Sequence, residues 1–220
     1  MLTKNTTVIA GADTTAITMR ALFYYCLKDP RVWAKLQSAI RCNPGIQPGK
    51  PVAHSVARAM PYLEAVVRET MRYHPAVCMI MERIVPSGDC GGLALPDGSV
   101  VPGGSMVGMN PYIVGRNKGI FGEDADVFNP DRWLQGEDES DEEFKERRAL
   151  YETASIMFGG GSRICLGRNL SQMELYKVVP TLIATFDIEL VDQQEKWWTC
   201  SRWFYRCKGV VCRLKPRSDL

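Results

Sequence analysis

The segment that most restricts how this chain can fold is Phe158–Gly167, with the sequence FGGGSRICLG. Consecutive glycines adopt backbone conformations that are closed to other residues, so the segment predicts a loop between regular elements. Such a loop can turn several backbone N–H groups toward one point, which favours an anion. Cys165 lies just before a predicted helix, whose free N–H groups and positive dipole end favour a thiolate. The sequence therefore predicts a loop that holds Cys165 as a thiolate, with Arg163 as a nearby cation.

Two other interpretations of this loop stay open at the level of the sequence. A glycine-rich loop can also cradle phosphate, but no Lys-Ser or Lys-Thr pair follows the glycines, so a nucleotide site is poorly supported. A free cysteine after a flexible loop would have the same composition and would need no ligand. The loop by itself does not decide between a liganded and an unliganded thiol.

Composition and charge exclude several classes of protein. Of the 220 residues, 45% are hydrophobic and 24% are charged, which excludes a disordered tail, a collagen and a disulfide-dense miniprotein. The net charge of +2 lacks the basic excess of nucleic-acid-binding proteins, so no nucleic-acid partner is expected. No apolar run approaches the roughly 18 residues that cross a bilayer, and Lys4 and Asn5 interrupt the place of a signal peptide.

Apolar periodicity and turn formers predict a mainly α fold of the α+β class. Helices are expected over 2–28, 30–40, 61–74 and 166–186, the second opened by Asp29-Pro30 and the third closed before Pro75. Strands are expected over 77–85, around a turn at 96–99 with a strand at 106–109, and as a hairpin over 188–214. Residues 43–51 and 110–133 should be irregular, and the acidic run 136–146 should be a solvated surface insertion.

The eight cysteines give little information about compartment or metal binding. They form no CxxC pair, and His54 and His74 are the only histidines. Most of the cysteines, Cys165 apart, are expected to be reduced, small apolar residues of the core. The alternative is a zinc or disulfide module, which would require Cys200, Cys207 and Cys212 to act together.

Four segments together resemble the cytochrome P-450 family of haem-thiolate monooxygenases, in the family's order along the chain. The segments are Ala10–Thr15, Glu69–Arg72, Asn129–Trp133 and Phe158–Gly167. The resemblance extends over essentially the whole chain. The sequence near Asn129 and Trp203 is most similar to fungal members such as pisatin demethylase. It implies the C-terminal part of the P-450 fold, in which residues 1–220 form a partial domain.

The resemblance implies that haem b is bound through the Cys165 thiolate, the axial ligand of the iron, which pushes electron density to favour O–O cleavage. It also implies that Arg163 and Arg83 pair with the haem propionates, since guanidinium groups suit carboxylates geometrically. Considered alone, Arg83 would be a charge on an edge strand. The other cofactor-binding residues that the resemblance implies are Phe158, Gly161 and Gly167.

Asp13 and Thr14 are polar residues in the middle of an apolar helical segment, where a threonine hydroxyl can compete for a backbone carbonyl. From spacing alone they could be a solvent-facing patch. The resemblance implies that they are catalytic: Thr14 would steady dioxygen and a water, while Asp13 relays protons from solvent.

Glu69 and Arg72 are three residues apart on one predicted helix, so their side chains can meet. As a surface pair they would contribute less than about 1 kcal/mol. The resemblance implies instead a buried network with Arg132 that locks the scaffold of the haem loop. Its role would be structural and not catalytic.

The function that the resemblance implies is activation of dioxygen and insertion of one oxygen atom into a small hydrophobic organic substrate. Electrons would come from a flavin-containing NADPH reductase, and the parent protein would lie on the cytosolic face of the endoplasmic reticulum membrane. Family members are roughly twice as long, so the N-terminal half and the membrane anchor are expected to be absent. The alternative is a non-catalytic truncated remnant without a complete substrate and haem pocket. One departure from the family is Gly115, which stands before Arg116 where many relatives carry His.

Overall fold

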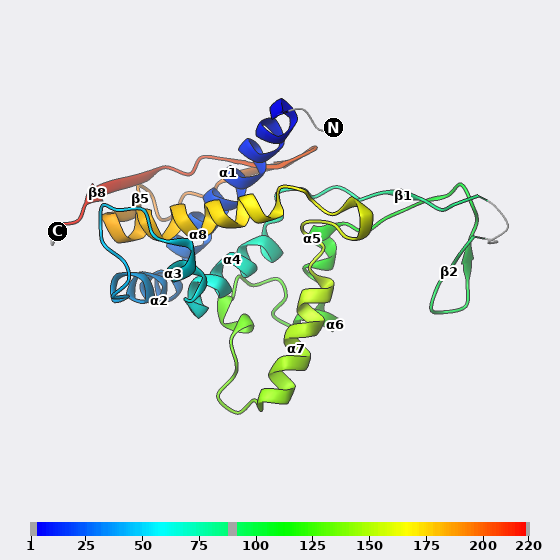
Figure 1. Ribbon diagram of the computed structural model, residues 1–220, viewed down its shortest axis with the longest axis horizontal. Coiled ribbons are helices and arrows are strands. Elements are labelled where there is room, and N and C mark those ends of the chain that lie inside the picture. The colour runs from blue at the N-terminus through cyan, green and yellow to red at the C-terminus, as the bar shows by residue number, and fades with distance from the viewer. Residues whose placement is uncertain (1–3, 88–91, 219–220) are drawn as a thin grey trace.

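The computed structural model of this chain describes residues 4–87 and 92–218 and is mainly helical (Figure 1). The described helices are α1 (Lys4–Lys28), α2 (Pro30–Arg41), α3 (His54–Arg58), α4 (Pro61–Tyr73), α5 (Pro111–Val114), α6 (Lys118–Phe121), α7 (Asp141–Ala154) and α8 (Arg168–Thr185), with the 3-10 helices η1 (Pro130–Trp133) and η2 (Gly161–Arg163). The described strands are β1 (Arg83–Ile84), β2 (Leu93–Ala94), β3 (Val100–Val101), β4 (Met106–Val107), β5 (Phe186–Leu190), β6 (Trp198–Ser201), β7 (Tyr205–Lys208) and β8 (Cys212–Pro216). These elements confirm the predicted fold class.

The main hydrophobic core lies between α1, α2, α4 and α8. Each of these helices contributes a side chain with no exposed surface, namely Leu22, Leu36, Leu63 and Ile183. On α2, buried residues recur every fourth position, which places them on one stripe of the helix. Burial of these stripes against one another supplies the hydrophobic stabilisation of the helical body.

Local signals at the predicted helix ends are confirmed. The Asp29 carboxylate accepts hydrogen bonds from the N–H groups of Arg31 (2.9 Å) and Val32 (3.3 Å), with Pro30 in the first helical position. These bonds satisfy donors that have no partner within the helix. Helix α4 stops at Tyr73, two residues before Pro75.

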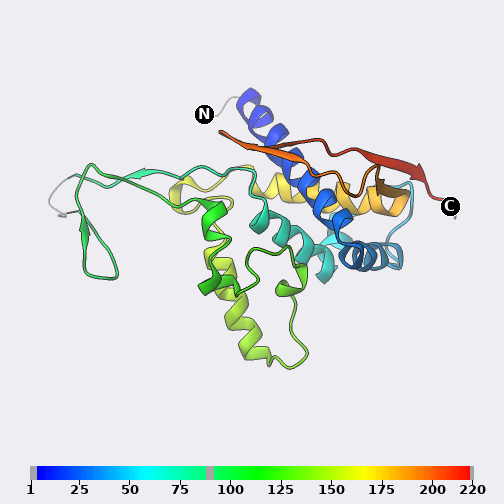
Figure 2. The same ribbon diagram turned by 180° about the vertical axis from the view of Figure 1, so that it is seen from behind.

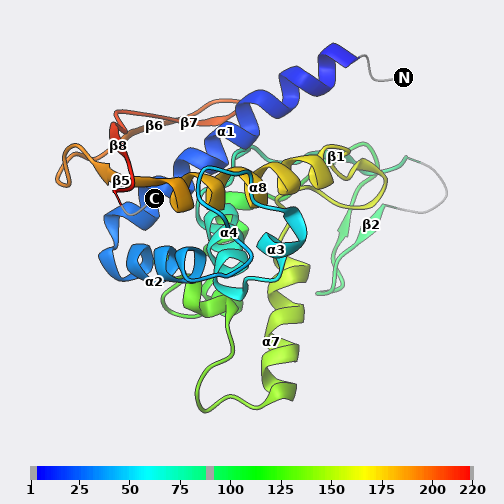
Figure 3. The ribbon, with the colours of Figure 1, turned by 60° about the vertical axis from the view of Figure 1, so that its left-hand side comes forward.

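A second, smaller core lies on the other side of α4. It is formed by residues of α4, α6, η1 and α7 and the loop between α6 and η1, namely Ala65, Phe121, Ala125, Trp133 and Tyr151. Figure 3 shows α7 running away from the helical body on this side. This core joins α7 to α4 and places the end of α7 before the Cys165 loop.

The described strands form four two-stranded antiparallel sheets. Two of them, β1–β4 and β2–β3, build an arm that extends from the helical body (Figures 1 and 2). The other two, β5–β8 and β6–β7, form the predicted C-terminal hairpin, which contacts α1 and α8. The turn at 96–99 lies between β2 and β3, as predicted.

The structure corrects several predicted boundaries. The acidic run 136–146 is exposed except at Glu139 and Phe144, which are half-buried, and from Asp141 it is the start of α7, where carboxylates suit the positive end of the helix dipole. Short helices α5, α6 and η1 occupy much of 110–133, because Asn110, Asn117 and Asn129 cap each of them. Helix α3 was not predicted, and α8 begins at Arg168 and not at residue 166. Among the described residues, no helix has the length and apolar character needed to cross a membrane.

Candidate functional site: the Cys165 loop and the buried Glu69 network

Glu69 lies at the centre of a buried ion-pair network and has no exposed surface. Arg72 donates to both of its carboxylate oxygens, Nε to Oε2 at 2.8 Å and Nη2 to Oε1 at 2.7 Å. Arg132 Nε donates to Oε1 at 3.1 Å. The Trp133 indole and the Asn129 backbone N–H complete the shell at 2.9 and 2.8 Å. The structure therefore brings Glu69, Arg72 and Arg132 together in the interior, and not on the surface.

The remaining donors of both guanidinium groups bind backbone carbonyls and, for Arg132, the Asp124 carboxylate. Arg72 donates to the carbonyls of Gly115, Ala125 and Val127, the last two at 2.7 and 3.0 Å. Arg132 donates to Phe121 O at 2.7 Å and to both Asp124 carboxylate oxygens at 3.0 Å. Burial opposes the charge of Arg132, but the carboxylates of Glu69 and Asp124 hold its pKa above the usual value. The network thus fastens the segment from α5 to η1 onto α4.

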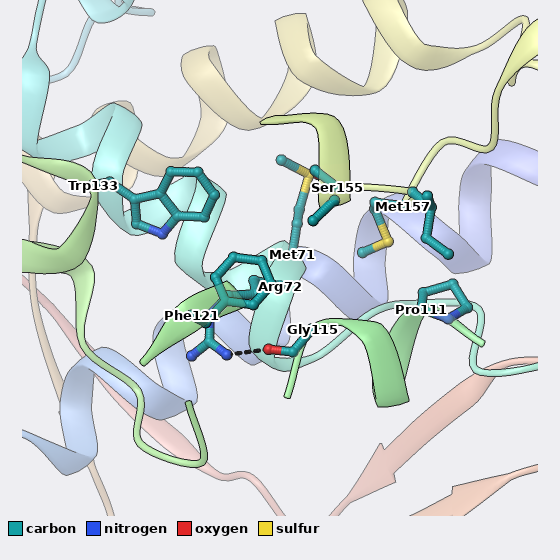
Figure 4. A pocket seen from close by; sticks show the side chains of 10 residues that line it. Met71, Arg72, Pro111, Gly115, Phe121, Trp133, Ser155 and Met157 are labelled. Atoms are coloured by element: carbon teal, nitrogen blue, oxygen red, sulfur yellow. Dashed lines mark hydrogen bonds between the residues drawn. The ribbon is translucent and has the colours of Figure 1, made fainter. Parts of the chain in front are cut away.

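The departure at Gly115 has a steric explanation. A Cβ atom at this position would lie 2.6 Å from the backbone oxygen of Arg72, so a histidine would force the backbone apart. The carbonyl of Gly115 also accepts a hydrogen bond from the Arg72 guanidinium, which Figure 4 shows beside a narrow pocket. That pocket is lined by Met71, Arg72, Pro111, Gly115, Phe121, Trp133, Ala154, Ser155, Ile156 and Met157.

Cys165 lies in an exposed loop with little support from side chains. Its N–H donates to Phe158 O at 2.8 Å, which closes the loop, and its carbonyl accepts from Arg168 N–H at 3.4 Å. Gly159 and Gly161 have φ values of +69° and +58°, a conformation that favours glycine. The structure confirms the predicted loop and leaves the Cys165 thiol exposed.

The other predicted haem-contact residues lie in or near this loop. Phe158 is half-buried, whereas Arg163 in η2 is exposed. A Cβ atom at Gly167 would lie 3.9 Å from Cys165 Sγ, and one at Gly159 would lie 3.9 Å from Met81 Sδ. The segment before β1 therefore passes close to the loop. Arg83 is exposed on β1, and its side chain donates to Glu82 O at 2.7 Å.

Asp13 and Thr14 lie on α1 in different surroundings. Thr14 is half-buried as a residue, and its hydroxyl donates to Ala10 O at 2.9 Å, one turn earlier. Asp13 is exposed and pairs with Arg206 of β7, Nη2 to Oδ2 at 3.3 Å. Both side chains are open to the surface, which is also what the alternative of a solvent-facing patch requires.

The residues around Cys165 fit an iron porphyrin. A Cβ atom at Gly160 or Gly161 would meet no other heavy atom within 4 Å, so there is open space over the loop. The apolar residues Leu166 and Leu170, which follow Cys165 in the chain, are exposed at 80% and 47%. A soft sulfur ligand on an open apolar face, with the Arg163 guanidinium two residues away, suits a flat apolar group that carries iron and carboxylates.

Sequence reasoning missed two features that the structure places around the site. The Trp133 indole and the Asn129 N–H complete the shell of Glu69, and the spacing of the motifs gives no signal for either bond. Arg147 of α7 donates to the backbone of η1 at Arg132. Arg147 directly follows the run 136–146 that was predicted to be a surface insertion, and no motif connected it with the network.

The prediction that most cysteines belong to the core is wrong for the described residues. Of these, Cys26 and Cys207 are buried, whereas the others are half-buried or exposed. The expectation for Cys90 lies outside the described residues. Cys200, Cys207 and Cys212 are free, and no three potential metal ligands gather anywhere in the described part of the chain. The structure gives no support to the alternative of a zinc or disulfide module.

Comparison with known proteins assigns the chain to a family. The sequence pattern of the Cytochrome P450 family matches residues 3–215. The chain is 52% identical over 213 residues to Cytochrome P450 monooxygenase cfoH of Aspergillus candidus, covering 97% of this chain and 39% of that protein. It is 41% identical to Cytochrome P450 monooxygenase pkfB of Emericella nidulans, covering 96% and 39%.

Another relative, Cytochrome P450 monooxygenase cicH of Emericella nidulans, is 38% identical and covers 100% of this chain and 42% of its own length. The chain thus spans about two fifths of the length of these curated fungal relatives. The matched range, residues 3–215, includes the Cys165 loop and the Glu69 network, and this chain belongs to the cytochrome P450 family.

Proposed function

We propose that this chain carries the haem-binding part of a monooxygenase that activates dioxygen and inserts one oxygen atom into a small hydrophobic organic substrate. The observation that supports this most directly is the exposed Cys165 thiol in a glycine loop with open space above it. Haem b would supply the redox chemistry of oxygen activation when bound through the Cys165 thiolate. Residues 1–220 would be one part of the P450 domain.

One group of residues would bind the cofactor. Cys165 would hold the iron, and Gly161 and Gly167 would leave room for the macrocycle against the loop, beside Phe158. Arg163 and Arg83, both exposed, would bind the carboxylates of the cofactor. None of these groups is buried by the rest of the described chain, so each is free to contact a ligand.

Asp13 and Thr14 would hold and move protons. The Thr14 hydroxyl uses its proton toward Ala10 O, which leaves its oxygen able to accept a hydrogen bond from a water. The Asp13 carboxylate contacts solvent and the Arg206 guanidinium, so it can exchange protons with bulk water. The pair would pass protons from solvent to the oxygen substrate. Glu69, Arg72 and Arg132 would hold the scaffold and would not touch the substrate.

Electrons for the reaction would come from a flavin-containing NADPH reductase. The complete protein would act on the cytosolic face of the endoplasmic reticulum membrane. Both proposals follow from family membership. The second candidate, a non-catalytic remnant, is favoured by the many exposed apolar side chains of the arm, including Ile84 at 70% and Met106 at 69%.

The test is the absorption spectrum of the protein loaded with haem, reduced and exposed to carbon monoxide. We expect the Soret band of thiolate-ligated haem in the wild type and in Cys42→Ala, because Cys42 is also exposed but lies at the end of α2. Cys165→Ala should lose that band. An unchanged spectrum in Cys165→Ala would place the ligand elsewhere, and failure of the wild type to bind haem would leave the remnant as the better description.

A further inference from the structure

Helix α7 leads directly into the segment that ends at Cys165, so the position of the helix decides where the loop begins. We propose that Arg147 is a positioning residue for Cys165: it fastens α7 to the η1 segment and thereby fixes where the chain enters the loop. The role in haem binding rests on the proposed function. The fastening itself depends only on the contacts of Arg147.

Arg147 uses its whole guanidinium group in these contacts. Nε and Nη2 each bind one oxygen of the Glu139 carboxylate, both at 2.6 Å. Nη2 also donates to Leu134 O at 2.9 Å, and Nη1 donates to Arg132 O. One planar group thus joins α7 to two backbone carbonyls and to the loop before the helix. A guanidinium can form this fork, whereas a lysine ammonium cannot.

These contacts extend the buried network toward the Cys165 loop. The Arg132 side chain binds Glu69 on α4, and its backbone carbonyl accepts from Arg147 on α7. Arg132 is therefore held from two sides. A continuous series of charge-assisted hydrogen bonds connects α4, η1 and α7.

The end of α7 moves with Arg147 because the intervening turn is packed. Tyr151, one turn after Arg147, is buried with its ring centroid 4.9 Å from that of Phe121 and 5.4 Å from that of Trp133. A packed helix behaves as a rigid element, so a shift at Arg147 reaches Ala154. A shift of Ala154 also shifts the loop, because the loop segment begins at the next residue.

Beyond Ala154 the packing is looser. The narrow pocket of Figure 4 lies between Met71 of α4 and the residues Ser155 and Met157, which follow α7. Side chains on either side of a gap lose the contacts that would fix their spacing. Beyond Ala154 the position of the chain therefore depends on how α7 itself is anchored.

The neighbouring residue Arg148 provides a matched control. It binds Glu64 at 3.0 Å and Glu152 at 3.2 Å, and its side chain is 36% exposed, compared with 27% for Arg147. Its partners are side chains and include no backbone carbonyl of η1. Glu64 lies on α4 and Glu152 on α7, so Arg148 ties α7 to α4 through one partly buried pair and makes no contact with η1. Arg148→Gln changes the same charge on the same helix without releasing η1.

The experiment compares Arg147→Gln with Arg148→Gln in two measurements on the full protein. Amide hydrogen exchange of the haem-free protein over residues 155–167 should become about tenfold faster in Arg147→Gln and stay unchanged in Arg148→Gln. Haem transfer to an excess of a haem-scavenging apoprotein should become about tenfold faster in Arg147→Gln alone. Glu139→Gln, which removes the carboxylate partner, should reproduce both effects and replaces Arg147→Gln if that variant does not fold.

The outcomes separate the inference from the proposed function. Equal exchange over 155–167 in the Arg147 and Arg148 variants would overturn the positioning role, even if Arg147→Gln lowers the melting temperature. Faster exchange with unchanged haem transfer would overturn the link to Cys165. A wild type that binds no thiolate-ligated haem would overturn the proposed function, while hydrogen exchange would still test the fastening.

Discussion

The Glu69 network and the Cys165 loop contrast in how each is held. The Glu69 carboxylate has no exposed surface and accepts from two arginines, an indole and a backbone N–H. Cys165 is exposed, and backbone hydrogen bonds of its loop hold it in place. The hydrogen-bond partners of the Glu69 carboxylate all come from the chain itself. The Cys165 loop leaves its reactive groups free for a ligand.

The contrast follows from the cost of burying charge. A buried carboxylate without partners would cost several kcal/mol, so the chain must supply those partners itself. An exposed thiol is solvated, so it needs no partner from the chain and remains available to bind a ligand. We therefore expect substitutions in the network to change stability and substitutions in the loop to change ligand binding.

The largest effect should come from Glu69→Gln. The substitution keeps the size of the side chain but leaves the buried Arg72 guanidinium without a counter-charge and Arg132 with the Asp124 carboxylate alone, at a cost of about 3–5 kcal/mol. The free energy of unfolding, measured with denaturant, checks this. Glu189→Gln in the exposed pair with Arg213 is the control and should cost less than about 1 kcal/mol. Equal losses in both variants would remove the distinction between interior and surface pairs.

The next largest effect is a pH dependence of the free energy of unfolding, caused by His74 at the end of α4. His74 is fully buried, with Nε2 3.2 Å from Tyr205 O and Nδ1 3.3 Å from the Tyr25 hydroxyl. Burial, with a contribution from the Arg116 charge, lowers the pKa of His74 to about 4, below its usual 6.5. The unfolded chain thus binds the extra proton first, and stability should fall by up to about 3 kcal/mol as pH drops from 6.5 to 4.

Unfolding free energies measured across this pH range check the prediction. His74→Gln should flatten the pH dependence, whereas His54→Gln, at an exposed position on α3, should keep it. An unchanged slope in His74→Gln would assign the proton uptake to another group.

A smaller loss of stability is expected at the surface end of α7. Ser140 caps the helix, its hydroxyl accepting from Glu143 N–H at 3.3 Å, while the Glu143 carboxylate accepts from Ser140 N–H at 2.9 Å. Ser140→Ala should cost about 1 kcal/mol, because a donor of the first turn loses its partner. Denaturant unfolding measures this against Ser201→Ala, an exposed serine of β6. If both variants cost the same, the cap contributes nothing.

The smallest effect on stability is expected at Cys165. Cys165→Ala removes an exposed side chain from a loop and should change the unfolding free energy of the haem-free protein by less than about 0.5 kcal/mol. The same variant should lose thiolate-ligated haem. Cys165→Ala should thus change ligand binding and leave stability nearly unchanged, whereas Glu69→Gln should change stability. A loss of several kcal/mol in the haem-free protein would show that the loop is part of the core.

Local sequence determined much of the fold. Asp29-Pro30 starts α2, His74-Pro75 ends α4, and tryptophans with β-branched runs indicate the C-terminal hairpin, because each signal acts over a few neighbouring residues. The glycines of 159–161 gave the Cys165 loop for the same reason. The start of α7 escaped prediction because an acidic run suits both a solvated loop and a capped helix.

Tertiary structure decided which polar groups are buried. Glu69 and Arg72 have the spacing of any surface pair, and their sequence alone fits either environment. Burial arises because η1 folds over α4 and brings Arg132 and Trp133 to the carboxylate. Gly115 likewise has no room for a side chain because the Arg72 carbonyl, 43 positions away in the chain, lies against it. Motifs thus identified the residues of the site, but only long-range packing could make one set a sealed network and leave Cys165 open.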